Sequence, residues 1–345
     1  MAEDLTYTPV CRWCGKGPMG FRFTFDRTPS PGSGAEPVTY VMEWCQACGT
    51  YQVNPHPGPA MAREFFSSPE LYVRTFDPEG RGVDPVSRAE QRLEEYRGYA
   101  SAAMRLMPEN GTVIDLGAGT GLMLSLFPDS YRRIAVEPNP EAASKAIARG
   151  LEVTVSWAED LEKPPGEIAL AIFNQSLDHF VRPDVMLGRV LNWIPPGGMV
   201  LLSGLVNPKS VASRITGPMF RLWHPFHQVY PPRDAVMSRL AAYGFETVAV
   251  WRPYFRTPYG SLPALLAGAF TLTKAFLLRN RRGTPSPPWP GNTLSYLARK
   301  TLLFKPLPAL DAAAIPAKIR RRKTGLVAPM GRDGSSGPEA GPRGA

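Results

Sequence analysis

The 345-residue chain lacks the features that define several common protein classes. Its four cysteines are too few for a scaffold held together by disulfides. Glycine and proline are abundant but show no Gly-X-Y period, which excludes a collagen. Because 43% of the residues are hydrophobic, the chain is not mainly disordered and can bury a large core. For this length we expect two domains with extensions.

No segment has the composition of a secretion signal or a membrane span. Residues 1–14 lack the basic flank and the apolar run of a signal peptide. The longest mostly apolar stretch near the C-terminus, between Arg256 and Lys274, is interrupted by two prolines and two glycines. A spanning helix needs about 20 continuous apolar residues. We therefore expect a cytoplasmic protein.

Acidic residues are scarce only toward the C-terminus. Residues 1–251 carry 23 Lys and Arg against 27 Asp and Glu, whereas residues 252–345 carry 16 against 3, so the net charge of +9 divides into −4 and +13. Basic clusters flank the apolar segment 262–270 of this tail. We favour, in this order, a helical cover for the rest of the protein, peripheral contact with the anionic inner face of a membrane, and binding of RNA phosphates.

Composition divides the chain into five regions. Residues 1–58 hold all the cysteines and predict a zinc-ribbon-like module, and residues 59–108 predict a helical lid or linker. Residues 109–251 predict a ligand-binding α/β domain, and residues 252–324 a basic, apolar, helical extension. Residues 325–345 are rich in glycine, proline and serine and predict a disordered tail.

The region 109–251 alternates short apolar runs with helical patterns. Such runs predict the strands of a parallel sheet that is covered on both faces, and hence a doubly wound α/β fold. This fold binds ligands at the carboxyl ends of its strands. The predicted strands are 112–116, 134–137, 151–155, 168–173, 199–203 and 247–251, and the predicted helices are 122–127, 140–149, 183–193 and 233–243.

A glycine-rich turn follows the first predicted strand. Gly117, Gly119 and Gly121 let the backbone approach a ligand closely, and we expect the turn to open onto the N-terminus of a helix. Their spacing differs from the Gly-x-Gly-x-x-Gly of dinucleotide sites. Asp115, just before the turn, would repel a pyrophosphate but suits an ammonium group. Glu137, after the second strand, suits a pair of ribose hydroxyls.

The ordered motifs of residues 86–251 resemble those of class I S-adenosylmethionine (SAM)-dependent methyltransferases. Segments 113–121, 135–138, 158–161 and 172–179 resemble the first four motifs of that family, and 191–202 resembles the segment before and within its fifth strand. The resemblance implies SAM as cofactor. It also implies a seven-stranded Rossmann-like sheet with one antiparallel strand, whose seventh strand the sequence does not locate.

The resemblance further implies roles for individual residues. Asp115 and the glycine turn would hold the methionine part of SAM, Glu137 the ribose, and the segment from Trp157 to Glu159 the adenine. Asn174 and Gln175 would lie near the sulfonium. The implied cofactor-binding residues are Asp115, Gly117, Ala118, Gly119, Gly121, Glu137, Pro138, Trp157, Ala158, Glu159, Asn174 and Gln175.

The cysteines form two Cys-x-x-Cys-Gly pairs, Cys11 with Cys14 and Cys45 with Cys48. Four thiolates at this spacing can bind one Zn²⁺ tetrahedrally, and such a site is structural because it leaves no open position. The gap of 30 residues between the pairs exceeds the usual one, and a Pro/Gly/Ser-rich insertion at 27–37 accounts for the excess. Disulfides, a redox pair and iron are the alternatives, of which disulfides fit a cytoplasmic chain least.

Histidines supply candidate bases for the chemistry. Methyl transfer depends mainly on positioning, and a base is needed only when the acceptor loses a proton. His179 follows the fourth strand beside Asp178, where it can be a base or a packing residue, and the segment 223–230 predicts a substrate lid with His224 and His227. The candidate catalytic residues are His179, Asp178 and His227, and the residues expected to close the pocket are Phe65, Phe66 and Tyr72.

The sequence thus predicts a SAM-dependent methyltransferase of a small-molecule, sugar or lipid-linked acceptor, with a structural zinc. Bacterial sugar C-methyltransferases look similar in their four-cysteine module, but this chain shows no further α/β domain after residue 251. One alternative is an RNA methyltransferase, against which stand the acidic body and the absence of an Asn-Pro-Pro-aromatic motif at 174–177. The other is a non-catalytic zinc-ribbon binding protein on a methyltransferase scaffold.

Overall fold

The structure is a computed structural model. It describes residues 5–27, 38–68, 75–76, 82–83, 90–164, 166–255, 257, 260–277 and 286–301. Residues 28–37 of the predicted insertion at 27–37, Tyr72 and the tail from residue 302 lie outside these ranges. None of the described helices is long and apolar enough to cross a bilayer.

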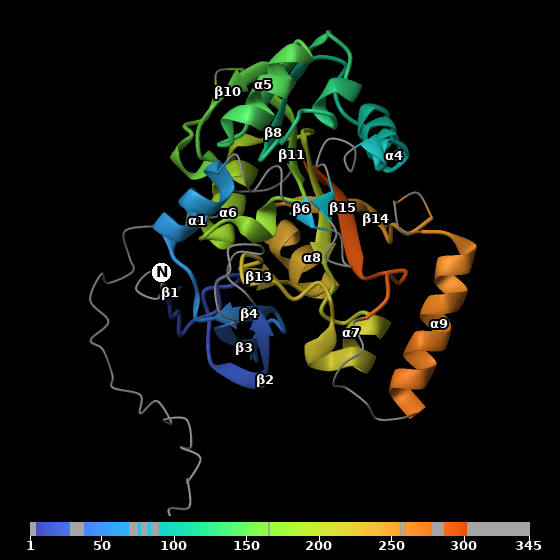
Figure 1. Ribbon diagram of the computed structural model, residues 1–345. Coiled ribbons are helices and arrows are strands. Elements are labelled where there is room, and N and C mark those ends of the chain that lie inside the picture. The colour runs from blue at the N-terminus through green and yellow to red at the C-terminus, as the bar shows by residue number, and fades with distance from the viewer. Residues whose placement is uncertain are drawn as a thin grey trace, which may run out of the picture. The chain divides into compact units, whose positions relative to one another are not determined.

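A seven-stranded sheet organises the larger part of these residues, in the strand order β10-β9-β8-β11-β12-β15-β14 (Figure 1). Five neighbouring strands are parallel, and β15 is antiparallel to both of its neighbours. The strands are β8 (Gly111–Leu116), β9 (Tyr131–Val136), β10 (Glu152–Thr154), β11 (Ile168–Asn174), β12 (Met199–Val206), β14 (Phe245–Trp251) and β15 (Thr293–Lys300). The fold prediction of a seven-stranded, Rossmann-like sheet is confirmed.

Two apolar clusters cover the two faces of this sheet. Successive strand residues point to opposite faces, so Val113 joins one cluster and Ile114 the other. The cluster of Ile114 is completed by α6 (Pro183–Trp193) and α8 (Arg233–Ala242), and that of Val113 by α4 (Leu93–Met104). The covering of both faces is what the near-continuous apolar strands predicted.

The seventh strand, which the sequence did not locate, lies beyond residue 251, where the predicted α/β domain ends. After β14 the chain forms α9 (Leu262–Leu277) and returns as β15, which is inserted between β12 and β14. Leu201 of β12 lies opposite Leu297, and Val250 of β14 lies opposite Tyr296. This pairing is nonlocal, and no local pattern in the sequence marks it.

Two other local predictions also need correction. The segment 122–127 forms a single 3-10 turn, η2 (Leu124–Leu126), so the glycine turn does not open onto an α-helix. The region 59–108 is not wholly helical, because β6 (Thr75–Phe76) and β7 (Gly82–Val83) pair between α1 (Pro59–Ser67) and α4. The predicted helices at 140–149, 183–193 and 233–243 are present as α5 (Pro140–Ala148), α6 and α8.

The N-terminal module shares a sheet and a core with the rest of the protein. Its strands β2 (Met19–Arg27), β3 (Val38–Cys45) and β4 (Tyr51–Asn54) are joined by β13 (Val229–Tyr230), which comes from the predicted lid. Trp13 is buried and donates from Nε1 to the carbonyl oxygen of Ala235 in α8 at 3.1 Å. A smaller pair, β1 (Leu5–Thr6) and β5 (His56–Pro57), lies within the same module.

Candidate active site and metal site

The glycine turn between β8 and η2 requires glycine at two positions. Gly117 and Gly121 have φ of +81° and +72°, in the left-handed region that side chains disfavour. A Cβ at Gly117 would lie 2.7 Å from Cβ of Ser176, and one at Gly121 would collide with Leu151. The backbone of the turn is therefore held against β11 and its neighbours without side chains between them.

Asp115, at the end of β8, is fully buried, and neither carboxylate oxygen has a hydrogen-bond partner among the described residues. Burial raises the pKa of Asp115 to about 8, and the charge of Glu137 adds to this, while nearby backbone amides of Asn174 and Leu116 oppose it. A buried carboxylate without partners is costly, and an ammonium group supplies the donors that it lacks.

Glu137 follows β9 and is held by backbone amides. Its Oε2 accepts from the amide of Gly119 at 2.8 Å and its Oε1 from the amide of Asn139 at 2.9 Å. Burial raises the pKa of Glu137, and these two amides oppose the rise. Each oxygen keeps a lone pair for a further donor, as a ribose diol would require. Pro138, predicted beside it, is half-buried.

A cavity of about 160 Å³ lies at the carboxyl ends of β8 and β11. Five of its lining residues were predicted to bind the cofactor: Gly117, Ala118, Gly119, Asn174 and Gln175. The lining residues that the sequence did not indicate are Tyr96, Thr120, Leu122 and Met123.

Gln175 is held in a strained backbone conformation at the cavity. It has φ of +56°, unusual for a residue with a side chain. Its amide donates to the carbonyl oxygen of Ser203 at 3.0 Å, and its Nε2 donates to Oη of Tyr96 at 3.3 Å. A side chain at Gly204 would collide with Gln175. The fixed side chain of Gln175 and the buried Tyr96 thus form one wall of the cavity.

The predicted adenine segment, from Trp157 to η3 (Ala158–Asp160), lies under α1 rather than on the lining of the cavity. Phe66 of α1 has its ring centroid 6.3 Å from that of Trp157, and Arg63 lies over Trp157 and pairs with Asp160 at 2.8 Å. Asn139 donates to the carbonyl oxygen of Ser68 at 3.0 Å, which ties the end of α1 to the start of α5. Among the described residues, one carboxylate oxygen of the side chain of Glu159 is buried without a hydrogen-bond partner.

The three candidate catalytic residues lie together. Asp178, buried in η4 (Leu177–His179), has its carboxylate oxygens 4.0 Å from Nε2 of His179 and 3.7 Å from Nδ1 of His227. The two imidazole centroids are 4.6 Å apart, and the rings are nearly perpendicular. The structure therefore places His179 and the lid residue His227, which are 48 positions apart in the sequence, next to the same carboxylate. His224 lies further off, with its ring 5.6 Å from that of His227.

Burial sets the protonation of this cluster. It lowers the pKa of His179, although the charge of Asp178 opposes the shift, and it lowers the pKa of His227 well below the ordinary value, with the charge of His179 adding to the effect. Burial raises the pKa of Asp178, against the charge of His179. Neutral imidazoles are the forms that can accept a proton.

Aromatic side chains of α1 pack against the histidines, and neither Phe65 nor Phe66 is among the lining residues of the cavity that they were predicted to close. Phe65 stacks on Phe226 of the lid with 3.7 Å between centroids and 8° between planes. Phe66 contacts His179 edge to face at 5.1 Å. The amino-terminal helix, the lid and the end of β11 therefore meet at the histidine cluster.

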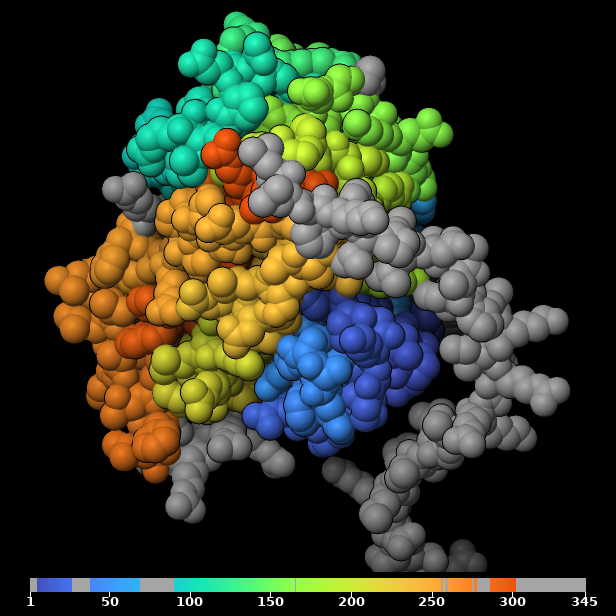
Figure 2. All heavy atoms as spheres, turned by 180° about the vertical axis from the view of Figure 1, so that it is seen from behind, coloured from blue at the N-terminus to red at the C-terminus, as the bar shows by residue number. Residues whose placement is uncertain are grey.

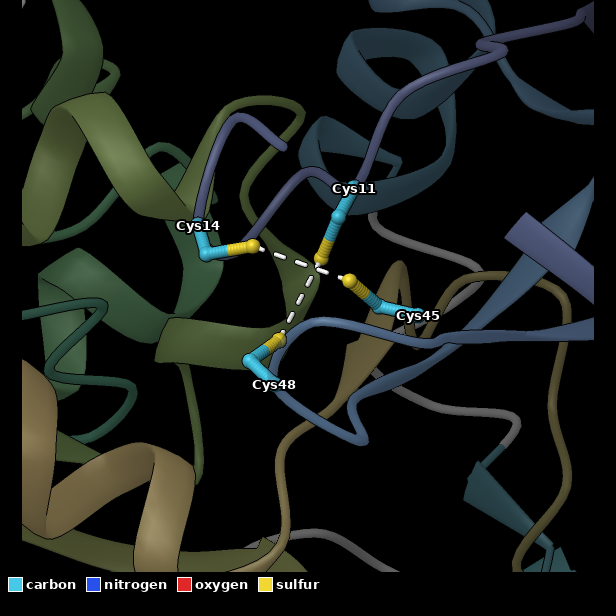
Figure 3. Close-up of side chains that lie close together, drawn as sticks. All are labelled: Cys11, Cys14, Cys45 and Cys48. Carbon is cyan, nitrogen blue, oxygen red and sulfur yellow. Dashed lines mark hydrogen bonds between the residues drawn. The ribbon is translucent and has the colours of Figure 1, made fainter. Parts of the chain in front are cut away.

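The four cysteine sulfurs converge from two matching turns (Figure 3). All four lie within 4.8 Å of one another, with 3.7 Å from Cys11 to Cys48 and from Cys14 to Cys45. A tetrahedral zinc with Zn–S bonds of about 2.3 Å requires sulfurs about 3.8 Å apart. In each turn a glycine amide donates to the first cysteine's carbonyl oxygen, from Gly15 to Cys11 and from Gly49 to Cys45. The cluster is compatible with the predicted zinc module.

Comparison with known proteins identifies the class. Residues 83–250 match the family described as methyltransferase domain, so this part of the chain is a methyltransferase domain. No curated protein matches the sequence.

Several solved structures are partly similar to this chain. A SAM-dependent methyltransferase from Thermotoga maritima is 19% identical, covers 63% of this chain and 96% of its own, and gives a TM-score of 0.41. The magnesium protoporphyrin IX methyltransferase of Synechocystis PCC 6803, with bound SAM, is 12% identical, covers 70% and 96%, and gives 0.43. The plantazolicin methyltransferase with a monoazolic substrate analogue is 14% identical, covers 70% and 94%, and gives 0.46.

Proposed function

We propose that the protein is a SAM-dependent methyltransferase that acts on a small-molecule acceptor with a dissociable proton, and that zinc holds its N-terminal module in place. The observation that carries the proposal is the buried carboxylate of Asp115, which has no partner among the described residues and stands beside a glycine-lined cavity. A charge buried in this way costs stability unless a ligand satisfies it.

The residues around the cavity fit SAM in three respects. The carboxylate of Asp115 suits the ammonium of the methionine part, and the glycine turn leaves backbone amides accessible to its carboxylate. Each carboxylate oxygen of Glu137 can accept a further hydrogen bond from a ribose hydroxyl. Bound SAM supplies an electrophilic methyl group. The residues of the chain must position the acceptor and remove its proton.

The chain would position the acceptor and remove its proton. Direct displacement at a methyl carbon depends on alignment, which the rigid ends of β8 and β11 favour. The acceptor proton would pass to a neutral ring nitrogen of His179 or His227, and the carboxylate of Asp178 would stabilise the resulting imidazolium. Because burial keeps both imidazoles neutral, the pair is ready to act near pH 7.

The surroundings of the histidines favour a small acceptor with an apolar or aromatic body. Phe65, Phe66 and Phe226 pack on one another beside the cluster, and Phe66 contacts His179. An apolar body can be buried against these rings, while a hydroxyl or amine can reach an imidazole.

The zinc would affect the histidine cluster indirectly, through the structure of the N-terminal module. A zinc ion with four thiolates carries a net charge of about −2 and is structural. Arg12, inside the first turn and fully buried, offsets that charge and contacts the lid at Gln228. The metal would thus fix the lid on which His227 is carried.

Calorimetric titration of the zinc-loaded protein with SAM tests the proposal, followed by a screen of small acceptors with labelled methyl donor. We expect binding that is lost in Asp115→Asn. A folded wild-type protein that does not bind SAM would refute the proposal.

A further inference from the structure

Helix α9 presents an apolar face to solvent. Five large side chains of this helix are more than half exposed: Leu262 at 61%, Leu266 at 64%, Phe270 at 73%, Phe276 at 69% and Leu277 at 71%. Leu262, Leu266 and Phe270 are spaced by four residues, which places them along one side of the helix. Figure 2 shows α9 in orange at the edge of the view, beside the yellow segments that precede it.

The opposite side of α9 packs onto the protein. Leu272 is only 4% exposed and joins the apolar cluster of β2, β3 and α7 (Val211–Thr216). Gly268 lies against Pro287 and Trp289, where an added Cβ would be in ordinary contact at 3.4 Å. The inner side of α9 is therefore already buried, and the exposed apolar side chains on the outer side do not contribute to this packing. A surface helix of a globular protein normally turns polar residues outward.

The sequence on either side of α9 carries only positive charges. From residue 247 to residue 310 the sequence has nine lysines and arginines and no aspartate or glutamate. Lys274 is exposed on α9, and Arg214 is exposed on α7, which packs beside it. A lipid surface with anionic headgroups attracts lysine and arginine, at about 1 kcal/mol for each residue near the surface.

We propose that α9 is a peripheral membrane-binding helix that lies in the interface of an anionic bilayer. Leu262, Leu266 and Phe270 enter the boundary between headgroups and acyl chains, and Lys274 and the neighbouring basic residues contact the headgroups. A helix of 16 residues is about 24 Å long, shorter than the roughly 30 Å of hydrocarbon, so it lies along the surface rather than across it.

Charge and apolarity together select a lipid surface over other occupants. An RNA would use the basic residues and leave the leucines and phenylalanines uncovered, because its backbone offers phosphates. A second copy of the chain would bring its own positive α9 against this one, and like charges would oppose the contact. An anionic bilayer satisfies both features at once.

The proposal is tested by flotation of the full-length, zinc-loaded protein with vesicles. Vesicles of phosphatidylcholine alone are compared with vesicles that also contain phosphatidylglycerol, at low and high salt. The test variant is L266Q/F270Q, and the matched control is I147Q, which changes an exposed apolar residue of α5. Thermal melting and SAM titration verify that both variants fold.

We expect binding to anionic vesicles that weakens with salt, is about tenfold or more weaker in L266Q/F270Q, and is unchanged in I147Q. Absence of binding by the wild-type protein would overturn the proposal. So would binding that survives in L266Q/F270Q, since the basic residues alone would then account for it. A wild-type dimer that L266Q/F270Q converts to a monomer, without any vesicle binding, would assign the face to self-association. SAM binding is independent of each of these outcomes.

Discussion

The guanidinium of Arg12 donates to the backbone carbonyl oxygen of Gln228, with 2.7 Å between Nη2 and that oxygen. The same nitrogen is 2.8 Å from the carbonyl oxygen of Val53 in β4, and Nη1 donates to the side chain of Gln228. The amide of Gln228 in turn donates to the carbonyl oxygen of Asp178 at 2.7 Å. One buried cation in the cysteine module is therefore linked to both parts of the histidine cluster.

Arg12→Lys tests this link. Lysine keeps the charge but loses the planar fork that reaches separate acceptors. We expect a loss of about 1–3 kcal/mol in the free energy of unfolding, and a lower kcat with SAM affinity within about twofold of the wild-type value. Melting, SAM titration and initial rates measure the three quantities.

Arg133→Lys is the matched control for this substitution. Arg133 of β9 is partly buried, whereas Arg12 is fully buried, and it too donates to a backbone carbonyl, that of Phe127. An equal loss of kcat in both variants would mean that Arg12 has no special role in placing the lid.

Metal content gives a second test. We expect one zinc per chain, and Cys45→Ser should release it and lower the melting temperature, because Cys45 is fully buried in the core shared with the sheet. Elemental analysis and melting are the measurements. Cobalt substitution should give the absorption of a tetrahedral thiolate site. Ser144→Ala, on the exposed side of α5, serves as the control. A wild-type chain that folds fully after chelation would contradict a structural metal.

Asp115→Asn should abolish SAM binding and yet stabilise the free protein. The folded pKa of Asp115, about 8, lies above its unfolded value near 4, so this group favours folding most at low pH. That contribution is lost as the pH rises from about 4 through 8. At pH 8 we expect the asparagine variant to be more stable by about 1–3 kcal/mol. Denaturant titrations at several pH values measure the difference.

Binding should also release protons. Near pH 6.5 the free protein holds Asp115 neutral, whereas an ammonium partner favours the carboxylate, so close to one proton should leave per SAM bound. Calorimetry in buffers of different ionisation enthalpy counts it. Asp184→Asn is the control substitution for Asp115→Asn. Asp184 is also a buried aspartate, but it is paired with Arg182, so its substitution should destabilise the protein. A pH-independent affinity without proton release would argue against Asp115 as the ammonium site.

The histidine cluster predicts the shape of the pH profile once an acceptor is found. Because burial lowers the pKa values of His179 and His227, kcat should stay level at neutral pH and fall only below about pH 6.5. His179→Gln or His227→Gln should lower kcat by about 10²–10⁴ without changing SAM affinity. His224→Gln should have a smaller effect. Full activity in both His179→Gln and His227→Gln would exclude base catalysis by the pair.

Local sequence was sufficient for the parts of the fold that depend on neighbouring residues. The buried strands β8, β9 and β11 are apolar runs, and α6 begins at Pro183 and ends at Trp193 as the helical pattern predicted. Gly117, Asp115 and Glu137 stand at strand ends, where the chain order alone puts them at one edge of a parallel sheet. The two cysteine pairs could also be predicted to form one metal site from the sequence, because each pair lies in a short turn with its own glycine.

Only the tertiary structure decided which distant segments meet. β15 enters the sheet 41 residues after β14 ends, Arg12 reaches Gln228, and Tyr96 lines the cavity from α4. None of these contacts leaves a periodic trace, because each depends on packing and register between segments far apart in the chain. The sequence by itself therefore determined the strands, the cysteine pairs and the position of the carboxylates at strand ends. Long-range packing decided that His179 lies beside His227 and that the apolar face of α9 points outward.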